Sequence, residues 1–529
     1  MPDIYKCTNS LNRLGDLFFC FLIALIITVC SSVILAHADW TIGDDFETLQ
    51  TTAIGRAEPV SRHIGQENIA NGRFYPLGHC DLNILVFIPF GKTALAHYIY
   101  IWLQFLLLIF LFWKLLSTLD FNVSDEKIAK ASTGLKTFAL VLFTSSPGFL
   151  WVFTGVNFSD RILMILFAFF ALMFLHATKS VTEKEKNLYY SAAALTVFYA
   201  SYIKEPVAAC FCIFAASGLL FHKNICRKEK FFYLFLLING IVFFILYYFL
   251  AFKPHTSFYT SGEGGNLLKI FGTALMAEKT LLFIFLLTVF RLYRVIFKEE
   301  KCFFTDSLLF SGAGYAAAFI ILKLAVPYYF TPAMLLSMPA LVLAVLKMRK
   351  SFIIPVAVAA GITIVFNISA VYRNALMAYT ERTTHMPLMR TIAEHIKSGG
   401  ILYWHRPHNI PMSRHNPTIL GQRYMYNVFI DYAVRGGSSA VVPGSGENFI
   451  YVSEPNEIEL NEADIFFMPL YREKDGQPIP APDWLLKKLE QSGFGMLRCD
   501  LVHIRIFLKK GSYLEKNWYL ANTGTVPKK

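Results

Sequence analysis

The sequence predicts a polytopic α-helical membrane protein with about 11 transmembrane helices, followed by a soluble α/β domain. Three observations predict this fold class. The 529 residues are 55% hydrophobic and only 16% charged, which is the balance of a membrane protein. Apolar runs of the length that crosses a bilayer, roughly 20 residues, recur as far as residue 371. Residues 372–529 have the composition of a soluble domain.

The apolar runs give the expected helices in order. We assign eleven spans, at 17–37, 96–118, 132–150, 160–177, 188–203, 206–221, 231–251, 279–297, 306–325, 328–347 and 352–371. The runs at 188–203 and 206–221 are short and are separated by Lys204, Glu205 and Pro206. A re-entrant hairpin is therefore the alternative for this pair. Residues 1–371 form the predicted transmembrane domain, with a long first outer loop at about 38–95.

The distribution of charge predicts the orientation. Alternate loops carry 20 Lys and Arg residues, whereas the short loops of the other set carry 5. Because cytoplasmic loops are enriched in Lys and Arg, this asymmetry places the N-terminus in the cytoplasm. An odd number of spans then places the domain after residue 371 outside. The net charge of +12 lies in short clusters between apolar runs, so it argues for topology rather than for binding to nucleic acid.

The C-terminal segment alternates strand and helix patterns. ILYW, ADIFFMPLY and LVHIRIFL are typical of strands, and MPLMRTIAEHIKSGG and DWLLKKLEQSGFG are typical of helices that end at Gly. This alternation predicts a Rossmann-like half-sheet. No glycine-rich phosphate motif follows a strand, so we do not expect a nucleotide there. The three histidines of YWHRPHNIPMSRHNP do not have the spacing of a structural zinc site.

The candidate functional residues lie at the predicted outer face, where charged groups close to a membrane core are functional candidates. They are Asp44, Asp45 and Arg73 in the first loop, Asp160 and Arg161 before the fourth span, Lys204 and Glu205 before the sixth, and Tyr329 before the tenth. Each has a structural alternative. Asp160 suits a helix cap, Arg161 and Lys204 can extend toward the interface, and Tyr329 can belong to an aromatic belt. Their gathering on one predicted face favours a shared function.

These residue types suit one kind of chemistry. A carboxylate can take a proton from a hydroxyl or an amine, and cations beside it can hold a phosphate, which Arg does with two parallel hydrogen bonds. Positive charge also stabilises the charge that develops on phosphate as its bond to a sugar breaks. The combination at a membrane surface predicts transfer of a sugar from a lipid-linked phosphate donor to an acceptor.

Two motifs carry a family resemblance. WTIGDDFETL lies in the first outer loop soon after the first span, and VPYYFTPAMLLSMPAL opens a late apolar helix. With Asp160 in the next outer turn, this layout resembles the GT-C superfamily of polyprenyl-phosphate-dependent glycosyltransferases. That superfamily includes protein O-mannosyltransferases, lipid A aminoarabinose transferases, serotype-converting glucosyltransferases and oligosaccharyltransferases. The chain has DD where O-mannosyltransferases commonly have DE, and it lacks the WWD of oligosaccharyltransferases. The branch stays open.

The resemblance implies a function and a location. We expect transfer of a sugar from a polyprenyl-phosphate donor to a glycan, lipid or protein acceptor on the outer face of a bacterial inner membrane. Asp44 or Asp45 is the candidate general base, or a metal ligand together with Asp160. No cofactor is certain, but a divalent cation such as Mg²⁺ or Mn²⁺ would take oxygen ligands of this kind. The alternatives are a transporter or flippase of lipid-linked sugars and a non-catalytic envelope assembly protein.

Overall fold

The computed structural model describes two compact units of the chain, which are presented separately. The described residues are 2–39, 73–78, 80–82, 85, 93–119, 133–156, 158–222, 225–254, 266–348, 350–385, 387, 402–405, 449–452, 465–469, 483–497 and 504–510. One unit contains residues 1–36 and 58–376, and the other contains residues 37–57 and 377–529. The predicted boundary at residue 371 stays a prediction.

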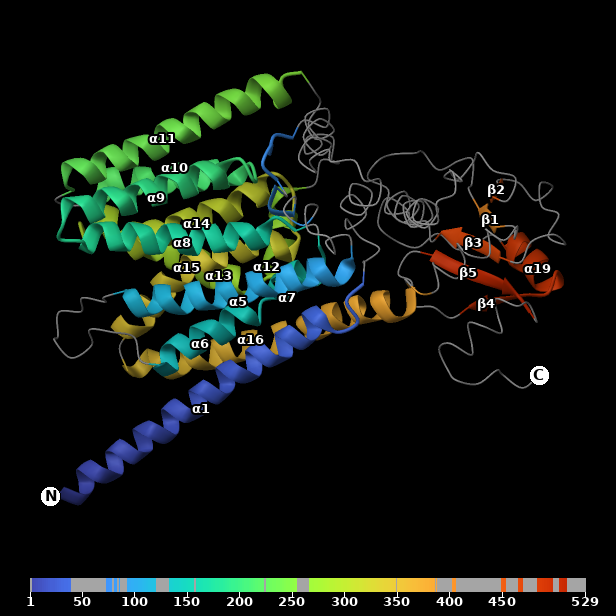
Figure 1. The fold of residues 1–529 in the computed structure, drawn as a ribbon, viewed down its shortest axis with the longest axis horizontal. Helices are drawn as coiled ribbons and strands as arrows, with labels where there is room; N and C mark the ends of the chain where they lie inside the picture. The colour runs from blue at the N-terminus through green and yellow to red at the C-terminus, as the bar shows by residue number, and fades with distance from the viewer. Residues whose placement is uncertain are drawn as a thin grey trace. The chain divides into compact units, whose positions relative to one another are not determined.

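The first unit is a bundle of helices (Figure 1). Its helices are α1 (Pro2–Leu35), α5 (Ala94–Thr118), α6 (Thr133–Thr144), α7 (Pro147–Thr154), α8 (Asp160–Lys179), α9 (Glu183–Ser201), α10 (Pro206–Phe221), α11 (Arg227–Tyr247), α12 (Leu267–Ala277), α13 (Thr280–Phe297), α14 (Phe304–Ile321), α15 (Pro327–Lys347) and α16 (Lys350–Thr380). A short 3₁₀ helix, η1 (Cys80–Leu82), precedes α5. Prolines occupy the first turn of α7, α10 and α15, where a missing N–H removes no intrahelical hydrogen bond.

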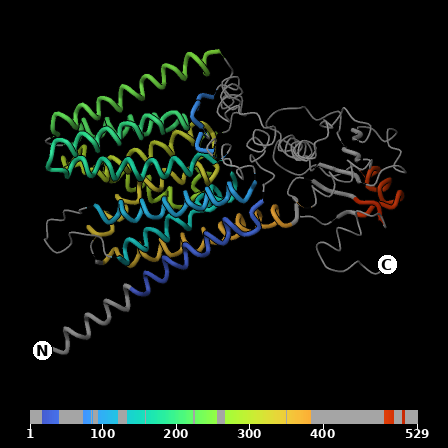
Figure 2. Tube along the Cα trace, in the orientation of Figure 1, coloured from blue at the N-terminus to red at the C-terminus, as the bar shows by residue number. Residues whose placement is uncertain are grey.

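The membrane character predicted from composition is confirmed. Among the described residues, 8 helices are long and apolar enough to cross a membrane, or 9 if the bent pair α6 and α7 counts as one span. The predicted spans at 188–203 and 206–221 correspond to two separate helices, α9 and α10 (Figures 1 and 2). Helix α9 packs along α8, and α10 packs mainly against α14 and α11. These two fall outside that count, because α9 begins with charged residues and α10 has only 16 residues. The total of eleven spans stays a prediction.

Aromatic and small residues fill the core of this unit. Phe170 of α8 packs against Phe211 and Phe214 of α10 with ring centroids 4.9 and 5.1 Å apart. Gly312 of α14 lies against α15 so closely that an added Cβ would stand 2.7 Å from the carbonyl oxygen of Ala333. This packing holds α8 against α10 and α14 against α15.

The second unit contains a five-stranded sheet in the order β2-β1-β3-β5-β4. Its strands are β1 (Leu402–His405), β2 (Phe449–Val452), β3 (Ile465–Pro469), β4 (Phe494–Leu497) and β5 (Ile504–Lys509), with helix α19 (Asp483–Gln491) before β4. Strands β1, β2 and β3 are parallel, and β5 pairs antiparallel with both β3 and β4. In the parallel part, Trp404 is in register with Tyr451 and Phe467.

Three predicted strands and the second predicted helix of this domain are confirmed as β1, β3, β5 and α19. The sequence reading missed β2 and β4, and the sheet is mixed rather than a parallel half-sheet. The first predicted helix, MPLMRTIAEHIKSGG, lies outside the described residues except for single positions near its start.

Candidate active site

Most of the predicted site residues lie at the starts of three helices. Asp160 is the first residue of α8, Lys204 and Glu205 immediately precede α10, and Tyr329 lies in the first turn of α15. Arg73 comes from the chain segment before η1. Asp44 and Asp45 lie outside the described residues. The prediction that these aspartates contribute a base therefore stays a prediction.

Asp160 and Lys204 form a buried ion pair. The Lys204 ammonium donates to both carboxylate oxygens of Asp160, with Nζ 2.6 Å from Oδ1 and 2.6 Å from Oδ2. The two residues are only 1% and 5% exposed. Removing an ion pair from water costs free energy that excellent geometry must offset. A cap for α8 would need only Asp160, and a lysine that extends toward the interface would need no buried partner. Neither structural alternative therefore accounts for the buried pair.

Aromatic rings surround the same ammonium group. Lys204 Nζ lies 4.4 Å from the ring centre of Tyr329 and 5.3 Å from that of Phe319, and these two rings stack with centroids 4.4 Å apart. Burial lowers the pKa of Lys204, and the Asp160 carboxylate opposes that shift. The rings of Tyr329, a predicted site residue, and of Phe319 thus form an aromatic box around the buried ammonium group of Lys204.

A second ion pair lies next to the first in the sequence. Arg73 donates from Nε and Nη2 to the two oxygens of Glu205, each over 3.3 Å. The backbone N–H of Phe74 also donates to Glu205, over 3.2 Å. Since Glu205 follows Lys204 directly, one turn between α9 and α10 holds both a cation and a carboxylate of the site and also anchors the chain that leads to η1.

Arg161 has a different set of contacts. It is 1% exposed, and its guanidinium donates to the backbone carbonyls of Val152, Gly155 and Val156 over 2.5, 2.7 and 2.5 Å. These carbonyls lie in and after the last turn of α7, where a helix has unsatisfied acceptors. The geometry favours a role in positioning α7; the predicted contact of Arg161 with phosphate stays a prediction.

Two residues that the sequence analysis did not select hold Arg161 in place. Arg161 Nε donates to Gln104 Oε1 over 3.1 Å, and Gln104 Nε2 donates to Asp81 Oδ2 over 3.0 Å. Gln104 is a buried polar residue in the apolar helix α5, and an amide within a span is the one signal that points to it. Its partner could not be identified without the fold.

The cluster has features of an anion site. Helices α8, α10 and α15 all start here, and helix N-termini present free N–H groups and a partial positive charge. The four charged side chains Asp160, Lys204, Arg73 and Glu205 sum to zero charge. Both cations of the cluster have a carboxylate as partner. The arrangement permits an anion such as phosphate to replace Asp160 as the partner of Lys204, or Glu205 as the partner of Arg73.

Metal binding has no cluster to support it within the described ranges. No group of three or more His, Cys, Asp or Glu side chains is placed to hold a metal ion in that part of the chain. Asp160 and Glu205 are the oxygen donors of the cluster, and each is paired with a cation. The predicted divalent cation stays a prediction, since Asp44 and Asp45 are not described.

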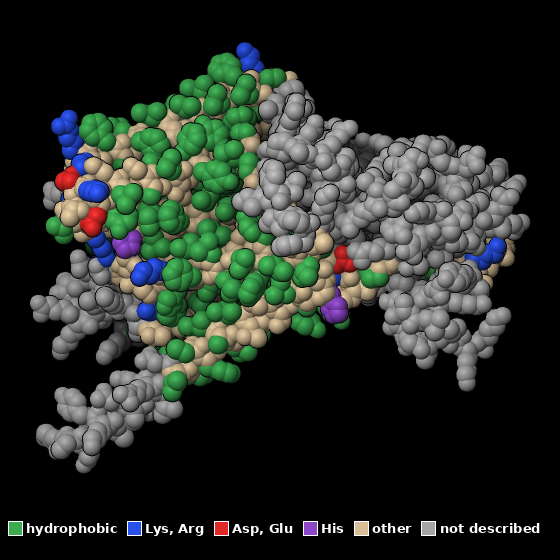
Figure 3. Space-filling view, in the orientation of Figure 1, with side chains coloured by type: hydrophobic (Ala, Val, Ile, Leu, Met, Phe, Trp, Pro, Cys, Tyr) green, Lys and Arg blue, Asp and Glu red, His purple; other side chains and the backbone are tan. Residues whose placement is uncertain are grey.

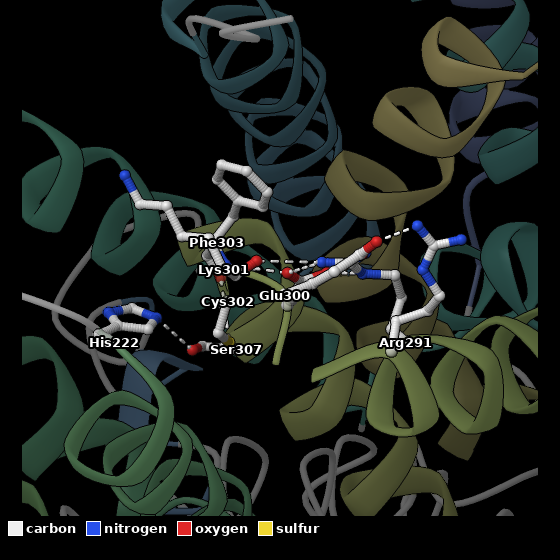
Figure 4. Close-up of polar contacts among 9 residues, drawn as sticks. His222, Arg291, Glu300, Lys301, Cys302, Phe303 and Ser307 are labelled. Carbon is white, nitrogen blue, oxygen red and sulfur yellow. Dashed lines mark hydrogen bonds and ion pairs between the residues drawn. The ribbon is translucent and has the colours of Figure 1, made fainter. Parts of the chain in front are cut away.

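Other charged residues gather at the far end of the bundle, on the left in Figure 3. There Arg291 donates to both oxygens of Asp306 over 2.8 and 2.7 Å and to Glu300 over 3.0 Å (Figure 4). Lys228 pairs with Glu183. Both residues lie in loops that are predicted to be cytoplasmic. The two ends of the bundle thus differ, as the positive-inside pattern predicts, although the orientation in a membrane stays a prediction.

Comparisons with known proteins give a similarity of fold. No family model matches the chain, and no curated protein matches it. Among solved structures, the chain is similar to crystal structures of ArnT from Cupriavidus metallidurans, one bound to undecaprenyl phosphate and one in the apo state. The TM-scores are 0.48 and 0.45, both at 12% sequence identity. The alignments cover 94% and 92% of this chain and 98% and 97% of ArnT.

Proposed function

We propose that this protein is a membrane glycosyltransferase that uses a polyprenyl-phosphate-linked sugar as donor. The observation that carries the proposal is the buried Asp160–Lys204 pair within an aromatic box, beside the Arg73–Glu205 pair. A lysine this deeply buried is a costly feature for stability alone. At the start of three helices, it suits a group that binds an anion arriving from the bilayer.

In the proposed reaction, one glycosidic bond forms as the bond between sugar and phosphate breaks. The oxygen or nitrogen of the acceptor attacks the anomeric carbon of the sugar and forms the new glycosidic bond. The bond between that carbon and the phosphate oxygen breaks, and polyprenyl phosphate leaves with the electron pair. The proton of the acceptor passes to a carboxylate, for which we propose Asp44 or Asp45 from their place in the sequence.

The described residues would act on the leaving phosphate. Lys204 has three N–H donors, two of which contact Asp160, and the planar guanidinium of Arg73 has the fork geometry that suits a phosphate. We propose that both cations turn toward the phosphate as negative charge develops on it. Asp160 and Glu205 hold them meanwhile, so that neither cation is left buried without a partner.

The acceptor and the sugar are the finer part of the proposal. We propose a glycan, lipid or protein acceptor on the outer face of a bacterial inner membrane, following the predicted topology and the resemblance. The experiment is a transfer assay in membranes with radiolabelled polyprenyl-phosphate sugars. Wild-type protein should transfer label, whereas Arg73→Ala should weaken use of the donor about 10- to 150-fold, the range for a charge-assisted hydrogen bond of roughly 1.5–3 kcal/mol.

A matched control separates this effect from a general loss of folding. Arg291→Ala also removes a mostly buried arginine from an ion pair with a glutamate, Glu300, but at the other end of the bundle. It should leave donor use unchanged. Equal loss in Arg73→Ala and Arg291→Ala would reject a phosphate-binding role for Arg73, and movement of lipid-linked sugar without transfer would favour the flippase alternative.

A further inference from the structure

The bundle contains a sharp helix break next to the candidate site. Helices α6 and α7 are bent by 65° where they meet, because Pro147 lacks the N–H that a continuous helix needs at that position. The break packs tightly on α15. A Cβ added to Gly148 would stand 2.4 Å from the carbonyl oxygen of Pro327, the residue that precedes Tyr328 and Tyr329. The position of α7 is thus coupled to the aromatic wall of the site.

A buried carboxyl group contacts this break. Glu278 lies between α12 and α13 and is 0% exposed. Ser146, the residue before Pro147, donates from its hydroxyl to Glu278 Oε2 over 2.5 Å. The backbone N–H of Thr280 donates to the other oxygen over 3.2 Å. One carboxyl group therefore joins the α12–α13 turn to the α6–α7 break.

Glu278 has no cation partner among the residues that the structure describes. The adjacent Lys279 turns away, with its Nζ 3.2 Å from the carbonyl oxygen of Met276 and 5.7 Å from the ring centre of Phe366. The other charged groups on the elements packed around Glu278 have contacts of their own or are exposed. They are Lys136 on α6, Lys269 on α12, Arg291 and Arg294 on α13, Asp306 on α14, Lys347 on α15 and Arg373 on α16.

A carboxyl group in this setting favours its neutral form. Burial disfavours the charged form of an acid, and the positive charge of the adjacent Lys279 offsets only part of this cost. Accordingly, burial raises the pKa of Glu278 more than the hydrogen bonds from Ser146 and Thr280 lower it. The neutral acid also has an O–H that can donate, whereas the ionised form can only accept.

We propose that Glu278 is a proton-binding site whose protonation stabilises the packing of the α12–α13 turn on the α6–α7 break. Loss of the proton leaves a buried negative charge without a described ion-pair partner, and the cost of that burial weakens the packing even though the hydrogen bonds from Ser146 and Thr280 favour the charged form. This inference does not depend on the proposed glycosyl transfer, because it concerns the protonation and stability of the folded chain.

Infrared spectroscopy of the purified full-length protein tests the proposal directly. The carbonyl band of a protonated carboxylic acid should persist in wild type above the pH at which an ordinary glutamate loses its proton, roughly 4.3, and this part of the band should be absent in Glu278→Gln. The matched control is Glu300→Gln, whose carboxylate contacts Arg291 and Arg294 and should contribute no such band. Identical spectra for wild type and Glu278→Gln at every pH would overturn the proposal.

A second measurement uses stability, and its sign is fixed by linkage. When the folded pKa lies above the unfolded value, the folded state binds more protons between the two values, so stability falls as pH rises through that window. The melting temperature of wild type should therefore fall as pH rises above the ordinary glutamate value, roughly 4.3. Glu278→Gln should lack this part of the slope. Parallel slopes in both proteins would overturn the proposal.

Ser146→Ala keeps the test informative if the Gln variant does not fold. It removes one hydrogen bond that stabilises the charged form, so the protonated band should persist to a higher pH than in wild type. An unchanged or lower titration point would contradict the contact on which the proposal stands.

Discussion

Replacement of Lys204 by Met is the most informative single change at the candidate site. The Met side chain is close to that of Lys in length and is apolar. It therefore fits beside Tyr329 and Phe319 but lacks the ammonium group. It leaves the Asp160 carboxylate buried, with its described ion-pair partner removed. We expect two separable effects, a loss of folding stability and a loss of donor use.

The geometry sets the size of the stability effect. At 2.6 Å and an effective dielectric constant of roughly 20, the attraction between the two charges is about 6 kcal/mol. Desolvation of both groups offsets much of it. Breaking a buried pair by removing one partner typically costs about 3–5 kcal/mol, because the remaining charge stays buried alone. We expect Lys204→Met to fall within that range.

The double variant separates stability from function. Adding Asp160→Asn removes the orphaned charge, so Lys204→Met/Asp160→Asn should recover most of the lost stability. It should not recover donor use, because the cation proposed to meet the phosphate is still missing. Thermal unfolding of the purified proteins measures the first effect. The apparent KM for the polyprenyl-phosphate donor and the transfer rate measure the second.

A buried ion pair at the other end of the bundle provides the matched control. Arg291 contacts Asp306 through two hydrogen bonds, and the Asp306 side chain is 2% exposed. Arg291→Met should cost comparable stability without changing donor use at permissive temperature. The reasoning is refuted if Lys204→Met transfers sugar like wild type, or if restoring stability in the double variant restores transfer as well.

Three further predictions concern other parts of the chain. Asp44→Asn and Asp45→Asn should differ, because on a helix two adjacent side chains would point about 100° apart; one should abolish transfer with donor binding kept, and equal wild-type rates would exclude both as the base. Arg161→Lys should lower the melting temperature, since an ammonium cannot reproduce a planar fork, and its donor KM should stay near wild type if the residue only positions α7. A reporter active only in the cytoplasm, fused after Lys529, should stay silent, and a strong signal would refute the predicted topology.

The sequence predicted the membrane architecture because apolar length and charge asymmetry act locally along the chain. It also predicted that Asp160, Lys204, Glu205 and Arg73 would lie at one face. The pairing among them was not predictable, since it depends on how α8, α10 and the segment before η1 meet across 44 and 132 positions of sequence.

Other features were missed for physical reasons. Glu278 follows an apolar helix and is succeeded by Lys279, so its sequence context resembles an exposed interfacial turn. Only the fold shows that its carboxyl group meets Ser146. The contacts of Arg161 with the end of α7 were not predictable from the sequence, because they depend on how α7 meets α8; its contact with phosphate stays a prediction. Strand β4 begins at Phe494, within the segment that was predicted as the end of a helix, and β2 was missed although it is no shorter than the predicted β1.

A structure determined with a polyprenyl phosphate bound tests the central claim most directly. The account predicts that the phosphorus atom lies within roughly 4 Å of the side-chain nitrogens of Lys204 or Arg73, the separation set by a charge-assisted hydrogen bond to a phosphate oxygen. The Asp160–Lys204 or Arg73–Glu205 contact should lengthen at the same time. A phosphate bound at the opposite end near Arg291, with both ion pairs unchanged, would contradict it.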